Sequence, residues 1–123
     1  MLPAMQAVQN QRAHPRFLYR QPVLMHLSDD EVYGETCDLS AGGLFVSLDV
    51  ELKQHSTVKF SLRFDGANTR AEYLARVVHV RRDADGKPTG AGFELVATTP
   101  ESRLAWVRHM HWIQEHGAQA DDF

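Results

Sequence analysis

Short runs of apolar residues, broken by turn-forming residues, occupy the chain from Val23 to Val96. In the clearest run, Thr57–Phe64, an apolar residue takes every second position. Because successive side chains of a strand point to opposite faces, this run predicts a strand with one buried face. Similar runs, rich in β-branched and aromatic residues, predict five more strands at Val23–Leu27, Val32–Cys37, Leu44–Ser47, Tyr73–Val80 and Gly90–Val96.

The segments between these runs are rich in Gly, Asp, Asn and Ser, the residues that tight turns favour. They lie at Ser28–Asp30, Asp38–Gly43, Asp65–Asn68 and Asp83–Pro88. Six short strands joined by such turns predict a mainly β fold, either a barrel or a sandwich.

The pattern changes period near the end of the chain. Thr99 is suited to cap a helix and Pro100 to occupy its first position, while Gly117 is suited to end it. We expect this helix to pack its apolar stripe against the barrel or across one end of it. The stripe is predicted to contain Trp106, Val107, Met110 and Ile113.

Composition is that of an ordinary globular domain. The chain has 123 residues, of which 43% are hydrophobic and 24% charged, enough for one modest core. No apolar run approaches the length of a membrane span, and the first ten residues lack the basic start of a secretory signal. Cys37 is the single cysteine, which excludes an intrachain disulfide and agrees with a cytoplasmic protein.

Charge is distributed unevenly along the chain. Three arginines and no Asp, Glu or Lys occur in residues 1–28, whereas all 16 acidic residues follow, and the net charge is −3. A mildly acidic body argues against DNA or RNA as a partner, because nucleic-acid binding needs a broad basic surface. An arginine-only segment on such a body favours a small, compact anion.

Two motifs carry the chemistry. Arg12 and Arg16 form an R-x-x-x-R spacing before the first predicted strand, and Asp38–Gly43 reads D-x-S-x-x-G between the second and third. In this order and context the two motifs resemble the signature of the PilZ domain family. The resemblance implies a six-stranded antiparallel barrel with a C-terminal α-helix over residues 12–116, preceded by a flexible lead-in (1–11) and followed by a frayed tail (117–123).

The resemblance also implies a ligand, the bacterial second messenger cyclic di-GMP. A guanidinium group can meet the O6 and N7 acceptors of guanine or the oxygens of a phosphate, and a carboxylate can accept from guanine N–H groups. Ser40 is expected to bind phosphate or to fix the turn, and Gly43 to adopt a positive φ or to let the ligand approach. The expected binding residues are Arg12, Arg16, Asp38, Ser40 and Gly43, with Arg20, His79 and Arg81 as accessory candidates.

The function that we expect is a cyclic di-GMP receptor or adaptor that changes conformation on binding and signals to a partner protein. The alternative is a PilZ-like scaffold in type IV pilus assembly or motility that binds no nucleotide. Members of that kind typically lack the motifs that this chain keeps. Gln11 precedes the first motif where many members carry another arginine, which leaves open whether one ligand molecule or two are bound.

The remaining chemistry-bearing residues have simpler readings. Seven histidines are present, but no H-E-x-x-H motif or Cys/His cluster accompanies them, so we expect neither a metal nor a cofactor. Without a catalytic constellation, we expect no enzyme. Trp106 is expected in the core and Trp112 off the buried stripe, and Cys37 is expected to be a structural thiol.

Overall fold

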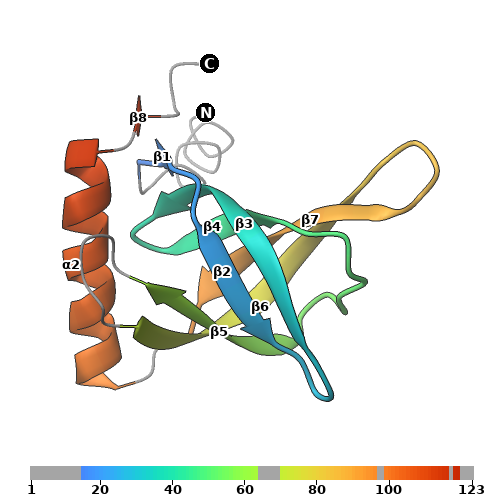
Figure 1. Ribbon diagram of the computed structural model, residues 1–123, viewed down its shortest axis with the longest axis horizontal. Helices are drawn as coiled ribbons and strands as arrows, with labels where there is room; N and C mark the ends of the chain where they lie inside the picture. Colours follow the sequence, from blue (N-terminus) through green and yellow to red (C-terminus); the bar gives the residue numbers. More distant parts are fainter. Residues whose placement is uncertain (1–14, 64–69, 97–98, 117, 120–123) are drawn as a thin grey trace, which may run out of the picture.

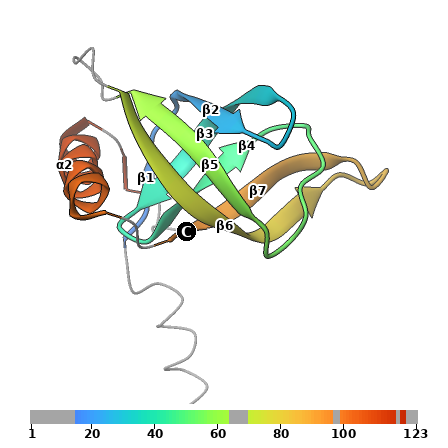
Figure 2. The same cartoon turned by 90° about the horizontal axis from the view of Figure 1, so that it is seen from below.

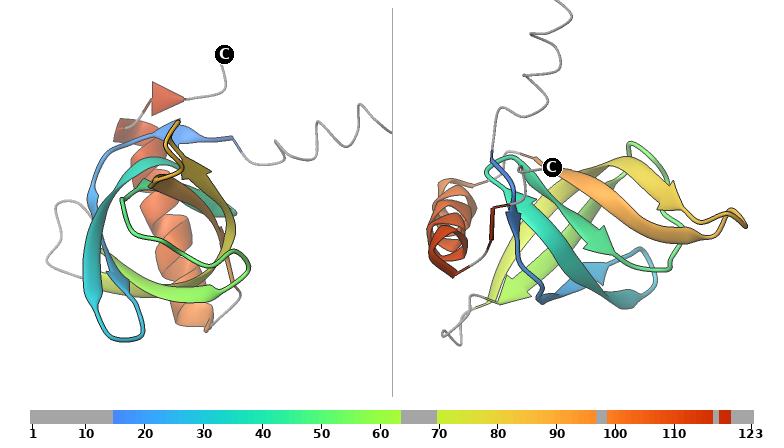
Figure 3. Two further views of the ribbon diagram at one scale, coloured as in Figure 1. Left: turned by 90° about the vertical axis from the view of Figure 1, so that its right-hand side faces the viewer. Right: turned by 90° about the horizontal axis from the view of Figure 1, so that it is seen from above.

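The computed structural model describes residues 15–63, 70–96, 99–116 and 118–119, and the fold that it shows is a closed antiparallel barrel (Figure 1). Its six strands pair in the order β2-β5-β6-β7-β4-β3, and pairing of β2 with β3 closes the ring. Figure 3 shows this ring from one end. The strands are β2 (Pro22–His26), β3 (Glu31–Ser40), β4 (Gly43–Ser47), β5 (Thr57–Arg63), β6 (Arg70–Arg82) and β7 (Pro88–Leu95). The expected six-stranded barrel is confirmed, and the sandwich alternative is excluded.

The predicted turn at Asp38–Gly43 is shorter in the structure. Strand β3 continues through Ser40 and β4 begins at Gly43, which leaves Ala41 and Gly42 as the turn. Asp38 and Ser40 are therefore strand residues, held by the ladder between β3 and β4 rather than by a loop.

Two short strands extend the sheet beyond the ring. Strand β1 (Phe17–Leu18) pairs with β3, and β8 (Ala118–Gln119) pairs with β1 (Figure 1). The tail expected to be frayed thus contributes one strand, because β1 presents a free edge that accepts it. Residues 1–14, where the lead-in and Arg12 lie, are outside the described residues.

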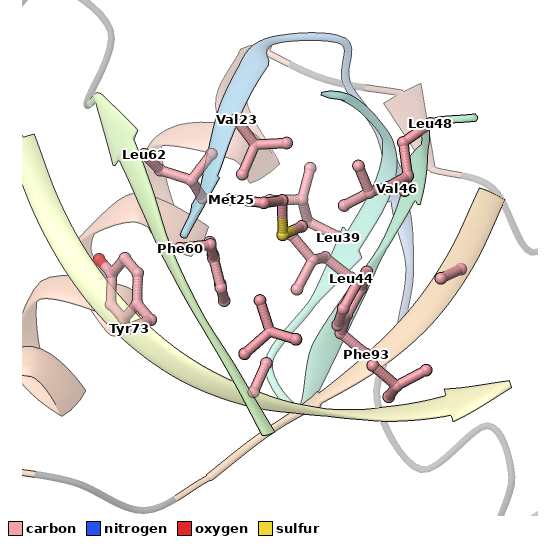
Figure 4. Close-up of a cluster of buried hydrophobic side chains, with 14 of the residues drawn as sticks. Val23, Met25, Leu39, Leu44, Val46, Leu48, Phe60, Leu62, Tyr73 and Phe93 are labelled. Carbon is pink, nitrogen blue, oxygen red and sulfur yellow. The ribbon is translucent and has the colours of Figure 1, made fainter. Parts of the chain in front are cut away.

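The barrel interior holds the core. Alternate residues of each strand point inward, and the inward side chains are almost fully buried (Figure 4). Each large apolar side chain removed from water contributes roughly 1.5–3 kcal/mol to folding. The central members are Val23, Met25, Leu39, Val46, Phe60, Leu62 and Val77.

Helix α2 (Pro100–His116) lies across one end of the barrel (Figures 2 and 3). The backbone N–H of Ser102 donates to the Thr99 hydroxyl at 3.1 Å, which confirms the expected cap. Within the described residues, no helix has the length and apolar character needed to cross a membrane.

The buried stripe of α2 differs from the prediction at one position. Val107 is 48% exposed, and His109 takes its place in the stripe beside Trp106, Met110 and Ile113. Val107 lies about 100° around the helix from Trp106, so its side chain is outside the buried face. His109 is buried because its Nε2 lies 2.9 Å from Oε1 of buried Gln21.

The two tryptophans join α2 to the rest of the fold. Trp106 is buried as expected, its ring 5.0 Å from that of Tyr73, and its Nε1 donates to the backbone oxygen of Ser40 at 3.1 Å. Trp112, off the main stripe, is half-buried against Tyr19, with ring centroids 5.2 Å apart. Trp106 thus ties the helix directly to the end of the D-x-S-x-x-G strand.

Candidate functional site

Asp38 lies on the outer surface of the barrel at the end of β3. Its neighbour Leu39 points into the core, so the alternation of the strand turns Asp38 outward. The pairing of β3 with β4 shifts register between Thr36 and Asp38, and beyond this irregularity Asp38 lies opposite Phe45. Partial burial raises the pKa of the Asp38 carboxyl, and the positive charge of Arg16 acts against that rise.

Strand β1 places Arg16 near this carboxylate. Pairing of β1 with β3 sets Leu18 opposite Asp38, and Arg16 lies two residues before Leu18. Its guanidinium is exposed and forms no ion pair within the described residues, yet its charge lowers the pKa of Asp38. The structure therefore brings together one arginine of the first motif and the aspartate of the second. The other arginine, Arg12, lies outside the described residues.

Ser40 holds the turn. The backbone N–H of Gly42 donates to its hydroxyl oxygen at 3.3 Å, and the hydroxyl donates to the Gly43 carbonyl at 3.4 Å. These bonds show the turn-fixing role expected for Ser40, and binding of phosphate stays a prediction.

Gly43 does not adopt the positive φ that was one of the two roles expected for it. Gly86 is the described glycine with a positive φ, so Gly43 needs no such conformation. Instead, a Cβ at Gly43 would lie 2.0 Å from the backbone oxygen of Phe93 in β7. Gly43 is buried, and its missing side chain lets β4 and β7 approach closely. The expectation of a positive φ was wrong.

A row of residues crosses four strands on the outer face, and we call it the outer row. Asp38 of β3 lies opposite Phe45 of β4, Phe45 opposite Gly92 of β7, and Gly92 opposite His79 of β6. Residues directly opposite each other in antiparallel strands share a face. Gly92 has no side chain and is buried, and the Phe45 and His79 side chains approach each other beside it.

Phe45 is the member of this row that sequence reasoning missed. Its ring centroid lies 5.8 Å from that of His79, and the Arg81 guanidinium sits 4.6 Å from the ring centroid. A Cβ at Gly90 would meet the Phe45 ring at 2.7 Å, so the ring packs closely against that glycine. Phe45 belongs to the run Leu44-Phe45-Val46, which resembles core, but strand alternation from buried Leu44 turns it outward.

The accessory candidates divide into two groups. His79 and Arg81 contact Phe45 and extend the outer row. Arg20 does not join them, since its guanidinium pairs with Glu35 at 3.2 Å and its charge is already balanced. Among the described residues, no three His, Cys, Asp or Glu side chains are grouped to hold a metal ion.

A second polar cluster resembles a catalytic triad in its contacts. His26 Nε2 lies 3.0 Å from the Ser61 hydroxyl, and His26 Nδ1 lies 3.1 Å from the Glu31 carboxylate. Ser61, however, is only 4% exposed, so a substrate carbonyl has no path to its hydroxyl. We read the cluster as a polar tie between β2, β3 and β5.

The comparisons with known proteins agree with this architecture. The family model of the PilZ domain matches residues 10–111. No curated protein matches the chain in sequence.

Solved structures share the fold at low sequence identity. The PilZ domain of YcgR from Escherichia coli, solved with c-di-GMP, has a TM-score of 0.70 and 15% identity over 86% of this chain and 93% of that one. The PilZ domain of CeSA from a cellulose-synthesizing bacterium has a TM-score of 0.63 and 22% identity over 80% and 97%. The Bacillus subtilis inhibitor of motility MotI/DgrA has a TM-score of 0.69 and 16% identity over 85% of this chain but 52% of its own, so this chain spans about half its length. With a family model that matches most of its length and a barrel shared with solved PilZ domains, this chain belongs to the PilZ domain family.

Proposed function

We propose that the chain is a receptor for cyclic di-GMP and that the nucleotide binds on the outer row. The observation that carries the proposal is that strand pairing places Arg16 close enough to Asp38, 22 positions away, for its charge to act on that carboxyl, beside an outward-facing aromatic ring. A cation, a hydrogen-bond acceptor and a flat apolar surface are the three features that a guanine nucleotide needs.

Each side chain has a definite part in this proposal. Arg16 donates to a phosphate or to the O6 and N7 atoms of guanine, and Asp38 accepts from the N–H groups on the other edge. A base lies over Phe45, and His79 and Arg81 flank it. Arg12 supplies the second guanidinium of the R-x-x-x-R motif. Ser40 and Gly43 keep the two strands in register beneath the ligand.

The relatives support this assignment. The YcgR PilZ domain, with the same barrel, was solved with c-di-GMP. The binding motifs that the family resemblance implies are both complete in this chain.

The nucleotide is proposed to act as a signal and not as a substrate. The Arg12–Arg16 segment closes over the bound nucleotide, and a partner protein recognises the changed surface. In this proposal the ligand is released unaltered.

Calorimetric titration of the whole chain with cyclic di-GMP tests the proposal. We expect saturable binding. Arg16→Ala and Asp38→Ala should each reduce the binding free energy by about 2 kcal/mol, or raise Kd roughly 30-fold, because each removes a charge-assisted contact. Arg20→Ala is the matched control, since it removes an equal charge already paired with Glu35, and it should change Kd by less than about twofold.

Two results would count against the proposal. Absence of binding heat with a folded protein would refute the ligand and leave the scaffold function as the remaining candidate. Equal losses in the Arg16 and Arg20 variants would show that only general positive charge matters and would refute the assigned site.

A further inference from the structure

A cavity lies beside the Ala41–Gly42 turn. It has a volume of about 320 Å³ and opens between this turn and helix α2. Its walls are largely apolar and include Leu95, Trp106 and Val107. The volume lies at the small end of the range for binding sites, about 300–1,000 Å³, so the cavity suits one bulky side chain.

The wall of the cavity contains a polar group without a partner. Tyr73 is 4% exposed, and its hydroxyl has no hydrogen-bond partner in the described part of the chain. Figure 4 shows this hydroxyl directed towards α2, and the Tyr73 ring contacts that of Trp106 at 5.0 Å. Leaving such a group unpaired costs about 1–3 kcal/mol.

The rim of the cavity is positively charged. Arg103 lines it and forms no ion pair with any described residue, although the body of the chain is acidic. An unpaired guanidinium beside apolar walls complements a carboxylate next to an apolar side chain.

The apolar surface extends beyond the cavity along α2. Leu104 is 50% exposed and Val107 is 48% exposed, and residues three apart share a helix face. These two side chains add exposed apolar surface beside the cavity, more than a small molecule in the cavity would cover. The occupant that fits is therefore a segment of a protein.

The cavity and the outer row share one structural part. Ala41 and Gly42 line the cavity, and they follow directly after Asp38–Ser40. The Ser40 backbone oxygen accepts from the Trp106 indole, and the Gly42 backbone oxygen accepts from Leu95 at 2.9 Å. A shift of this strand end on nucleotide binding thus moves two walls of the cavity.

We propose that this cavity receives an apolar side chain from an acidic segment of a partner protein, and that the shared turn couples its occupancy to the nucleotide. The coupling rests on the proposed function, whereas the docking surface does not. The partner segment places one Phe or Leu against Trp106 and Val107 and a carboxylate on Arg103, a pattern common to helices and peptides bound in grooves.

The test uses the full chain and labelled ten-residue peptides with a central Phe or Leu, flanked by Glu and Asp or, in the matched set, by Lys. Fluorescence anisotropy gives the affinities, and the Trp106 indole N–H signal in NMR spectra reports the place of binding. We expect the acidic peptides to bind roughly tenfold more tightly than the Lys-flanked set. Arg103→Glu and Val107→Asp should each weaken binding roughly tenfold, while Arg108→Glu, the same charge change off the cavity, should have less than about a twofold effect.

Three results would overturn the docking surface: equal binding of both peptide sets, insensitivity to the Arg103 and Val107 substitutions, or a chain dimer that Val107→Asp dissociates. The coupling is tested by repeating the titrations with saturating cyclic di-GMP, where we expect Kd to change by about threefold or more. An unchanged Kd with nucleotide bound refutes the coupling alone. If the nucleotide itself fails to bind, the proposed function fails, and the nucleotide-free titrations still decide the docking surface.

Discussion

The close approach of β4 and β7 at Gly43 makes Gly43→Ala a sharp test of the barrel wall. In the structure a Cβ at this position lies 2.0 Å from the Phe93 oxygen and 3.3 Å from Cα of Glu94. Both neighbours are backbone atoms of the paired strand, so no side-chain rotation can relieve the overlap. The two strands must separate by about 1 Å to reach an allowed contact.

The cost follows from what that separation disturbs. Gly43 pairs with Glu94, and Leu95 donates to the Gly42 oxygen at 2.9 Å, so a shift of this size weakens the bonds on both sides of the clash. Two weakened backbone bonds contribute about 1 kcal/mol each, and overpacking of a tight site costs about 1–3 kcal/mol. We expect Gly43→Ala to lower the free energy of unfolding by roughly 3–5 kcal/mol, a large part of the 5–15 kcal/mol typical of a domain.

Urea unfolding followed by tryptophan fluorescence measures this loss. Gly92→Ala is the matched control, because Gly92 lies in the partner strand and a Cβ there would meet only side chains, the nearest atom being His79 Nδ1 at 3.4 Å. That variant should cost less than about 1 kcal/mol. If Gly43→Ala is as stable as Gly92→Ala, close strand approach is not the reason for glycine in the motif.

Three further predictions concern Asp38, Phe45 and Trp106. Burial raises the folded-state pKa of Asp38, so the native state binds this proton more tightly than the unfolded state does. The protonated carboxyl therefore stabilises the fold at low pH, and this contribution is lost as pH rises through the raised pKa. Asp38→Asn should flatten this fall in urea titrations between acidic and neutral pH, and an unaltered profile would contradict the assignment. Phe45→Ala should weaken cyclic di-GMP binding by about 1–3 kcal/mol in calorimetry. Phe45→Leu should bind almost as weakly, because stacking needs an aromatic ring. Wild-type affinity in Phe45→Leu would refute stacking. Trp106→Phe removes the hydrogen bond to the Ser40 oxygen and should lower the free energy of unfolding by about 1 kcal/mol. Trp106→Ala also removes the packing of the ring and should lower it by about 3–5 kcal/mol. Equal losses of stability in the two variants would contradict these separate contributions.

The strands and the helix were predictable because their patterns are local. In Thr57–Phe64 the alternation alone identifies the inward face, and Thr99-Pro100 marks the helix start without reference to the rest of the fold. The closure of the barrel was not local, since pairing of β2 with β3 and β5 depends on the whole ring.

The errors arose where a partner strand decides the outcome. Gly43 was assigned a turn conformation from its own sequence context, but the backbone of Phe93, 50 residues away, is what requires glycine there. The strand β8 was missed for the same reason, because two residues carry no periodic signal and form a strand only against β1. Val107 was placed on the buried face of α2 from its helical spacing, although that face is centred elsewhere.

Of the proposed site, the motifs identified Arg16 and Asp38, and the structure added their shared surroundings. Phe45 was hidden in an apolar run, and its outward position follows only from the inward positions of Leu44 and Val46 on either side. The contact of Arg81 with the Phe45 ring joins β6 to β4 across β7, a relation that no local pattern contains.

The central claim is that cyclic di-GMP binds on the outer row, and NMR titration of the isotope-labelled chain tests it most directly. We predict that the nucleotide shifts the backbone amide signals of Asp38, Phe45, His79 and Arg81, and leaves those of His26 and Tyr33, on strands β2 and β3 at the other end of the ladder, unchanged. Shifts confined to His26 and Tyr33, or no shifts at saturating nucleotide, would contradict the account.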